Sequence, residues 1–348
     1  MKIHKKVVPT RLGEVSVYRI ENSRGAWVEL SEIGAGVIGV GVPDREGRIE
    51  NVCLSYGDIE DYMGDGPAMG KCPGRYANRI AFGRFRIGGK EYQLDTNLPP
   101  HHLHGGATGF HNRIWDSETD GTDVIFHRLS PDGEEGYPGN MEVSVRYNWD
   151  DDDRLTLSIK AVCDADTVVN ITNHGYWNLR GADSGTALDH EMRMRSSRCL
   201  VTDDKLVPTG EFAEVAGTPM DFLAFKTLGR DIHADFAPLL YGKGYDHCYL
   251  IDGWEPGRMS SEAVMLRERT TGRTLTVDSD QPGVQIYTGN WLKGCPRSRT
   301  GREYEDYDGV AVEMQGLPDA LNHPGFPSQE LHPGEEYLRK IIYAFGCE

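Results

Sequence analysis

Residues 141–162, MEVSVRYNWDDDDRLTLSIKAV, decide the fold class, because two alternating runs flank a row of four aspartates. In the runs 141–147 and 155–162, apolar residues recur at every second position. Side chains of a strand point alternately to opposite faces of a sheet, so this pattern is typical of strands with one buried face. Residues 150–153 are predicted to form a solvated turn, since a calcium loop needs a regular ladder of oxygen ligands.

The same alternation recurs along the chain at intervals of roughly ten residues. It predicts further strands at 14–20, 27–33, 122–129, 167–172, 263–268, 273–278, 284–288, 310–314 and 338–344. Gly88-Gly89 is predicted to join 85–87 and 90–92 in a tight hairpin, because glycine accepts the positive φ of a primed turn. Helices are predicted to be short, at 58–63 and 228–233. We therefore predict an all-β, large antiparallel fold in one domain over residues 1–348, with a loop-rich segment at 181–246.

One glycine motif suggests a nucleotide site. Residues 34–39, GAGVIG, fit the pattern G-x-G-x-x-G, but that fingerprint requires a helix that begins at the glycines. The next residues, VGVPD, cannot begin such a helix. The glycines are therefore predicted to serve a bend between two strands.

Charge and cysteine content limit the function class. The formal net charge is −17, which disfavours nucleic acid and anionic membranes as partners, because both select basic surfaces. No secretory signal and no membrane span are predicted, because no long apolar run is present. The seven cysteines include no Cys-x-x-Cys pair, so free thiols and a cytoplasmic location are expected.

The run 309–314 contains a carboxylate that needs an explanation. Glu313 lies in an otherwise apolar strand pattern, and a buried carboxylate is costly unless it is paired. His104, followed by two glycines, and His174, in the run Asn173-His174-Gly175, are possible partners. We interpret Glu313 as a general base and one of these histidines as the matching general acid.

Other polar residues suggest a sugar site. Asn78 and Arg79 carry planar amide and guanidinium groups that suit vicinal hydroxyls. Asp246 and Gln281 stand at the starts of strand patterns, where they would form the rim of a cleft. Near His174, Tyr176 and Trp177 could pack on a pyranose ring.

The histidines of the run 101–106, HHLHGG, invite a metal interpretation. Neighbouring strand residues point to opposite faces, and no second ligand motif completes a set, so no metal site is predicted. His102 and His104 would share a face. The glycines at 105 and 106 suggest a close approach of backbone or ligand.

Taken together, the motifs resemble the aldose 1-epimerase (galactose mutarotase) family over nearly the whole chain. They are GRYANRI at 74–80, LHGG at 103–106, SPDGEEGYPG at 130–139, TNH at 172–174, QPGVQ at 281–285 and EMQ at 313–315. The resemblance implies a β-sandwich of two large twisted sheets with the site in a cleft, and no cofactor. It implies a catalytic base at Glu313 and a catalytic acid at His174. For proton transfer in ring opening we expect Glu313 to be ionised and His174 to be protonated, each charge helping to hold the other.

The resemblance also implies a monosaccharide substrate and its binding residues, which are Asn78, Arg79, His104, Asp246 and Gln281. Trp177 and Met314 depart from the family pattern, and we expect them to flank the pocket and to affect substrate preference. A monomer or a homodimer is expected. The preferred aldose is left open.

Three alternatives remain for the function. A hexose-6-phosphate 1-epimerase needs extra cations near the cleft, and beyond Arg75 and Arg79 none is evident. A glycosidase needs two carboxylates, which Glu313 and Asp246 could supply. A non-catalytic sugar-binding protein would keep the hydroxyl-binding residues but lose Glu313 or His174.

Overall fold

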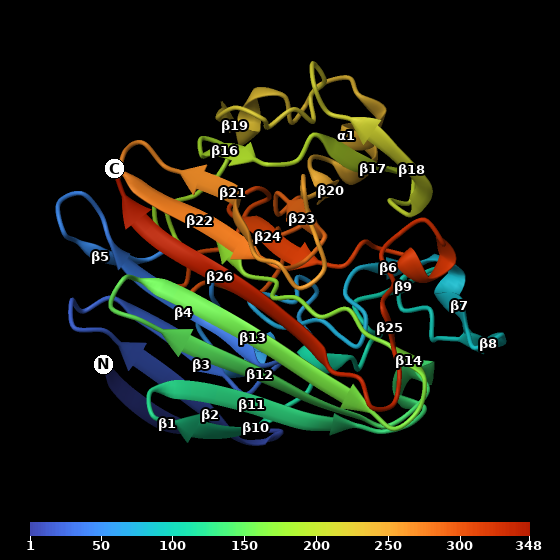
Figure 1. Ribbon diagram of the computed structural model, residues 1–348. Coiled ribbons are helices and arrows are strands. Elements are labelled where there is room, and N and C mark those ends of the chain that lie inside the picture. The colour runs from blue at the N-terminus through green and yellow to red at the C-terminus, as the bar shows by residue number, and fades with distance from the viewer.

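The structure, a computed structural model, describes all residues 1–348. The runs of alternating apolar and polar residues form strands of its largest sheet. Its nine strands pair in the order β10 (Asp116–Asp120), β11 (Asp123–Ser130), β12 (Met141–Trp149), β13 (Arg154–Cys163), β26 (Tyr337–Cys347), β22 (Arg273–Ser279), β21 (Ser260–Arg267), β16 (Glu191–Met194) and β19 (Lys226–Thr227). Every pair in it is antiparallel (Figure 1). In β12 the apolar side chains Met141, Val143, Val145 and Tyr147 are buried, as the alternation predicts.

Two further large sheets complete the sandwich. One has five strands in sequence order, β1 (Lys2–Thr10), β2 (Gly13–Glu21), β3 (Trp27–Ser31), β4 (Gly36–Pro43) and β5 (Ile49–Asn51). The other has six strands in the order β15 (Tyr176–Trp177), β24 (Val310–Gln315), β23 (Gly283–Tyr287), β20 (Asp246–Leu250), β17 (Arg198–Thr202) and β18 (Pro208–Glu214).

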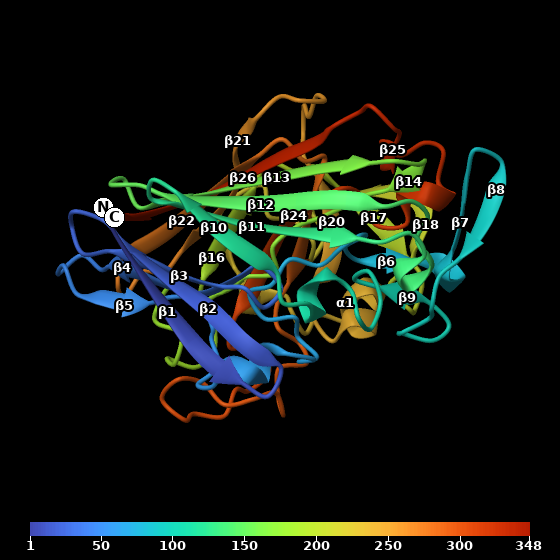
Figure 2. The same ribbon diagram turned by 90° about the horizontal axis from the view of Figure 1, so that it is seen from below.

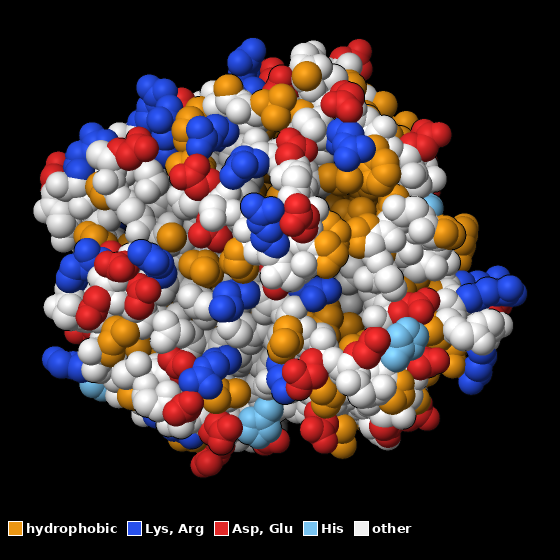
Figure 3. All heavy atoms as spheres, in the orientation of Figure 1, with side chains coloured by type: hydrophobic (Ala, Val, Ile, Leu, Met, Phe, Trp, Pro, Cys, Tyr) orange, Lys and Arg blue, Asp and Glu red, His pale blue; other side chains and the backbone are white.

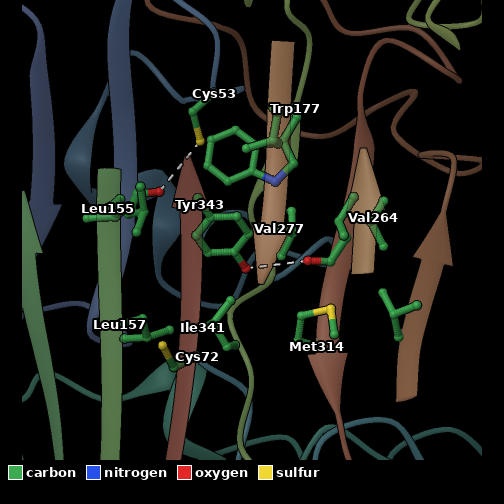
Figure 4. Packing of buried hydrophobic residues seen from close by; sticks show 14 of the residues in the cluster. Cys53, Cys72, Leu155, Leu157, Trp177, Val264, Val277, Met314, Ile341 and Tyr343 are labelled. Atoms are coloured by element: carbon green, nitrogen blue, oxygen red, sulfur yellow. Dashed lines mark hydrogen bonds between the residues drawn. The ribbon is translucent and has the colours of Figure 1, made fainter. Parts of the chain in front are cut away.

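The main hydrophobic core lies between the nine-stranded sheet and these two sheets. Val28 of β3, Leu157 of β13 and Val312 of β24 all belong to one buried cluster. Figure 2 shows the β1–β3 strands crossing beneath β10–β13. In Figure 4, Trp177 and Met314 point into this core, where the Trp177 and Tyr343 rings lie 5.1 Å apart.

Small elements connect the sheets. Three two-stranded ribbons are β6 (Arg79–Ile80) with β9 (His102–Leu103), β7 (Arg84–Ile87) with β8 (Lys90–Gln93), and β14 (Thr167–Val168) with β25 (Glu330–Leu331). The α-helix is α1 (Ala237–Gly242), and the 3-10 helices are η1 (Ile59–Tyr62), η2 (Ala81–Gly83), η3 (Phe110–Asn112), η4 (Glu134–Gly136), η5 (Leu228–Arg230) and η6 (Ala320–Asn322). None has both the length and the apolar character that crossing a membrane demands.

Several local predictions are confirmed. The hairpin turn at Gly88 and Gly89 has positive φ at both residues, and β4 begins at Gly36 without a helix, so the glycine motif is a bend between β3 and β4. The two predicted short helices correspond to η1 and η5.

Others differ from the structure. The strand expected at 167–172 is limited to β14, because the following residues turn to pair with other segments, such as Tyr76 with Asn170. The segment 181–246 contains β16–β19 and α1 as well as loops. In the turn 150–153, Asp153 is buried rather than solvated, and its carboxylate accepts from Asn22 and pairs with Arg24 at 2.7 Å.

Candidate active site

One face of the six-stranded sheet forms the floor of a cavity of about 510 Å³. The side chains that line it from this sheet are Tyr176 of β15, Glu313 of β24, Tyr287 of β23 and Asp246 of β20. The register places Gln285 opposite Glu313 and Asp246 opposite Tyr287. Because alternate residues of a strand share a face, these side chains gather on one side of the sheet while the core residues occupy the other.

The opposite wall comes from the β6–β9 ribbon. Asn78 and Arg79 stand at the start of β6, and His104 follows β9. His104 has a φ of 53°, so the chain leaves the strand direction there and turns this imidazole away from His102. A Cβ at Gly105 would overlap the carbonyl of Gly74, which confirms that backbone approaches closely at this glycine.

The turn separates histidines that were expected to share a face. His102 packs on Tyr137 and contacts its hydroxyl at 2.7 Å, whereas His104 lines the cavity. The shared-face prediction was wrong, because it assumed a regular strand through residue 104.

Glu313 and His174 line the cavity and contact each other. His174 Nε2 lies 3.4 Å from Glu313 Oε1, and the residues are only 4% and 1% exposed. Glu313 Oε2 and His174 Nδ1 have no hydrogen-bond partner in the protein. A close acid and base with unused polar atoms can exchange protons with a ligand.

Burial controls the charge of this pair. It raises the pKa of Glu313 well above 4.5, with a further contribution from the Asp246 carboxylate. It lowers the pKa of His174 to about 4. Burial therefore favours a proton on Glu313 and a neutral imidazole over the expected ionised pair, because transfer from water penalises both charges.

Asp246 is held from two sides. Arg79 pairs with its Oδ2 at 3.3 Å, and Gln285 Nε2 donates to its Oδ1 at 2.5 Å. Both Arg79 and Asp246 are largely buried. A carboxylate fixed in this way presents its remaining lone pairs to hydroxyl groups in a defined direction.

A hydrogen bond to the backbone fixes the tautomer of His104. Its Nδ1 accepts the backbone N–H of Asn78 at 3.1 Å, so a neutral ring carries its proton on Nε2. Burial lowers its pKa well below 6.5, and the nearby His174, with ring centroids 5.4 Å apart, adds to the effect. His104 is thus a neutral hydrogen-bond donor beside the Glu313–His174 pair.

This arrangement of a close acid and base among buried polar side chains agrees with the sequence comparisons. The aldose 1-epimerase family matches residues 16–344. A galactose mutarotase from Mus musculus is 38% identical over 97% of this chain and 96% of its own length. An aldose 1-epimerase from Escherichia coli K12 is 34% identical over 94% of both chains.

The chain belongs to the aldose 1-epimerase family. It is accordingly an isomerase that interconverts the α and β anomers of a free aldose. Solved structures agree in fold. An aldose epimerase homologue from C. elegans superimposes with a TM-score of 0.87 at 27% identity, and a galactose 1-epimerase from Lactobacillus acidophilus with 0.85 at 28%, each over 99% of both chains.

In this aldose 1-epimerase, six of the seven residues predicted for the site line the cavity, namely Asn78, Arg79, His104, His174, Asp246 and Glu313. Gln281 does not. Its side chain is fully buried and lies 3.3 Å from the Tyr337 hydroxyl and 3.5 Å from the Ile171 carbonyl. Gln281 precedes β23, whereas Gln285 lies within it and reaches Asp246.

Trp177 and Met314 do not flank the pocket. Each follows a cavity residue directly in its strand and therefore points to the opposite face, into the main core. Arg75 also lies away from the cavity, where its guanidinium donates to buried carbonyls and to Ser130. Neither Trp177 nor Met314 lines the cavity, so no direct contact supports their expected effect on substrate preference.

Three residues of this region were not predicted from the sequence. Gln285 and Tyr287 share a face of β23, which the alternation in 284–288 already implied. Trp291 stands on the rim, 64% exposed, and its backbone N–H donates to the Tyr287 hydroxyl. No pattern in the sequence indicates its position, because it lies in a loop.

Proposed function

We propose that this protein acts on a free hexopyranose such as galactose or glucose, with Glu313 as the general base and His174 as the general acid. The observation that carries the proposal is the 3.4 Å contact between Glu313 Oε1 and His174 Nε2 on the floor of the cavity. O1 and O5, the two oxygens that lose or gain a proton in this reaction, are both bonded to C1 in the pyranose ring. The groups that serve them must therefore be close neighbours.

The reaction needs one proton on the pair. Glu313 takes the proton of the C1 hydroxyl, the C1–O5 bond breaks as C1=O1 forms, and His174 gives its proton to O5. The C1–C2 bond then rotates, and the reverse transfers close the ring from the other face. The state favoured by burial, protonated Glu313 with neutral His174, equals the state after ring opening.

The remaining groups are proposed to orient the sugar. The donors and acceptors for its hydroxyls come from Arg79, Asp246, Asn78 and the neutral imidazole of His104. For the amide predicted at Gln281 we now propose Gln285, because it holds Asp246. No metal or cofactor takes part in these steps.

The alternatives receive less support. Besides Arg79, the cavity lining includes one other Lys or Arg side chain, Lys293. Its ammonium pairs with Glu305 at 3.0 Å, so no unpaired lysine is present there to bind a phosphate. A glycosidase role would require Asp246 as the second carboxylate, but Arg79 and Gln285 engage both of its oxygens.

We also propose one domain over residues 1–348, since the main core includes residues from Tyr18 to Phe345. A cytoplasmic location is supported by seven unpaired cysteines. The protein is proposed to act as a monomer or homodimer without nucleic acid or membrane partners, in keeping with its charge of −17.

Polarimetry on freshly dissolved α-galactose and α-glucose tests the catalytic assignment. Glu313→Gln and His174→Asn should each reduce kcat by roughly 10²–10⁴-fold, the usual contribution of a general acid or base. Circular dichroism should show an intact fold for both variants. Full activity in either variant would refute the role of that residue.

A further inference from the structure

A fully buried lysine lies beside the proposed acid. Lys71 is 0% exposed and does not line the cavity. Its carbonyl accepts the N–H of His174 at 2.8 Å, and the N–H of the preceding Gly70 donates to the His174 carbonyl at 2.9 Å. The backbone of His174 is therefore bonded on both sides to the Gly70-Lys71 segment.

The glycine motif at 34–39 makes room for this lysine. A Cβ at Gly34 would lie 2.8 Å from Lys71 Cβ and 2.9 Å from its Cδ, and one at Gly36 would contact its Cγ at 3.5 Å. A Cβ at Gly70 would overlap the Val37 carbonyl. The motif that suggests a nucleotide site in the sequence instead forms a groove that holds the Lys71 stem.

The ammonium group has a partner for each of its three donors. It is ion-paired with Asp65, donates to the Tyr62 carbonyl at 2.5 Å, and donates to Asn112 Oδ1 at 3.1 Å. Asp65 also accepts from the Tyr56 hydroxyl at 2.9 Å. These bonds connect two loops that reach the site.

The first of these loops includes Pro67, a cavity residue whose carbonyl accepts from the Tyr176 hydroxyl at 3.1 Å. The second follows His104 and ends in η3, where Asn112 stands next to His111. The rings of His111 and His104 lie 6.4 Å apart. One lysine thus fixes the backbone of His174 and both loops around it.

We propose that Lys71, paired with Asp65, is a positioning residue that holds His174 against Glu313 and sets the charge around its imidazole. The inference rests on the proposed function, because it assigns Lys71 a role through His174. A buried ion pair is a costly way to stabilise a fold, since apolar residues of similar volume often do as well. Its position behind the acid gives it a function that packing alone does not.

The groups around His174 support an electrostatic role. The titratable or charged groups that line the cavity with it or contact its ring are Glu313, Asp246, Arg79, His104, Tyr176, Tyr287, Lys293 and Cys295. His111 and Lys71 lie outside the cavity lining and also affect its charge. Burial is the main cause of the low pKa of His174, and the positive charge of Lys71 lowers it further while Asp246 opposes the shift. Lys71 has the same effect on the pKa of His111.

The decisive variant is Lys71→Met, which keeps the stem and removes the charge. We expect kcat to fall roughly 10- to 100-fold with a smaller change in KM, because a small displacement of a catalytic group slows the reacting step. The acid limb of the kcat/KM profile should move to higher pH, since His174 loses a nearby positive charge. A ¹⁵N titration of the His174 imidazole should show the same shift.

Asp65→Asn provides a milder second variant in case Lys71→Met does not fold. Burial already lowers the pKa of Lys71, and its Asp65 partner opposes that, so loss of the carboxylate favours a neutral amine. The acid limb should again move upward. Unchanged kcat and an unchanged limb in whichever variant folds would overturn the proposal.

Lys226→Met is the matched control. Lys226 is also buried, 7% exposed, and pairs with Asp231 at 2.9 Å, but it and its partners lie outside the cavity. It should lose stability while keeping kcat and the pH profile. An equal pH shift in this control would assign the Lys71 effect to general destabilisation and overturn the proposal.

Glu313→Gln, assayed in parallel, distinguishes a failure of the proposed acid and base pair from a failure of the proposed role of Lys71. If it retains full activity, the proposed acid and base pair fails independently of Lys71. If it is inactive and Lys71→Met behaves as the parent protein does, the pair stands and the positioning role fails.

Discussion

At the scale of single residues, the shared proton of Glu313 and His174 determines how the rate responds to pH. His174 has a pKa of about 4, so the pair takes up a second proton, on the imidazole, only below that pH. Glu313 has a raised pKa and loses the one remaining proton only on the alkaline side of it. The one-proton state therefore spans the interval between the two values, which belong to the coupled pair.

We accordingly predict that kcat/KM is constant from just above pH 4 into the neutral range and falls at higher pH. Initial rates from polarimetry across pH 3.5–10, corrected for the spontaneous reaction, measure the profile. A profile that rises steeply between pH 5.5 and 7.5 would show that His174 titrates like an exposed imidazole and would contradict the prediction.

The two glutamines provide a contrast between site and scaffold. Gln285→Ala removes a donor from Asp246, so kcat/KM should fall by about 10-fold or more, because a misdirected carboxylate binds the sugar less well. Gln281→Ala should instead lower the free energy of unfolding by about 1 kcal/mol, with activity kept, since it loses weak buried hydrogen bonds. Steady-state kinetics and urea unfolding of both variants test this, and the reverse pattern would restore Gln281 to the site.

The site residues were predictable where a residue type is costly in its setting. A carboxylate in an apolar run, as at Glu313, has few explanations. Gln281 and Gln285 are equivalent in composition, and only the strand register decides which one reaches Asp246. Lys71 gave no signal, because no local pattern marks a lysine as buried and its partner Asn112 lies 41 residues away in the sequence.

At the scale of elements, β13 shows what the alternation contributes to stability. Leu157 is fully buried, and Leu157→Ala should destabilise the protein by about 2–5 kcal/mol through lost contacts and a cavity. Ser158 points to the opposite face, and Ser158→Ala should change stability by less than about 0.5 kcal/mol. Equal losses in urea unfolding would mean that the two faces of β13 are not distinct.

Long alternating strands such as β12, β13 and β26 were predictable, because each has one buried face. The strands β15–β19 were not, because β15 and β19 have only two residues each and the burial of β16, β17 and β18 does not alternate regularly. The helix α1 begins with a proline near its first position and has only six residues, so hydrophobic spacing could not distinguish it from a loop.

At the scale of the whole molecule, charge should influence which sugars react well. The formal charge is −17, and Figure 3 shows acidic and basic side chains interspersed over one face. We predict a lower kcat/KM for glucuronate than for glucose at low ionic strength, with the gap narrowing as salt screens repulsion. Rates at 10 and 150 mM salt test this, with glucose as the neutral control. A gap that does not respond to salt would exclude long-range repulsion as its cause.

The order of strands in the sheets could not be predicted from the sequence. β13 pairs with β26, which lies at the far end of the chain, and β15 pairs with β24 across more than a hundred residues. Alternation specifies which face of each strand is buried but contains no information about its neighbour. Packing of the whole core decides the order.

The short distance between Glu313 and His174 has a consequence for the proton balance of the whole cycle. The proton that ring opening places on the carboxyl group returns to the sugar on closure, and the imidazole recovers the one it gave. No hydrogen ion has to enter from or escape to bulk water between successive turnovers. The enzyme therefore does not depend on buffer to regenerate the pair between turnovers.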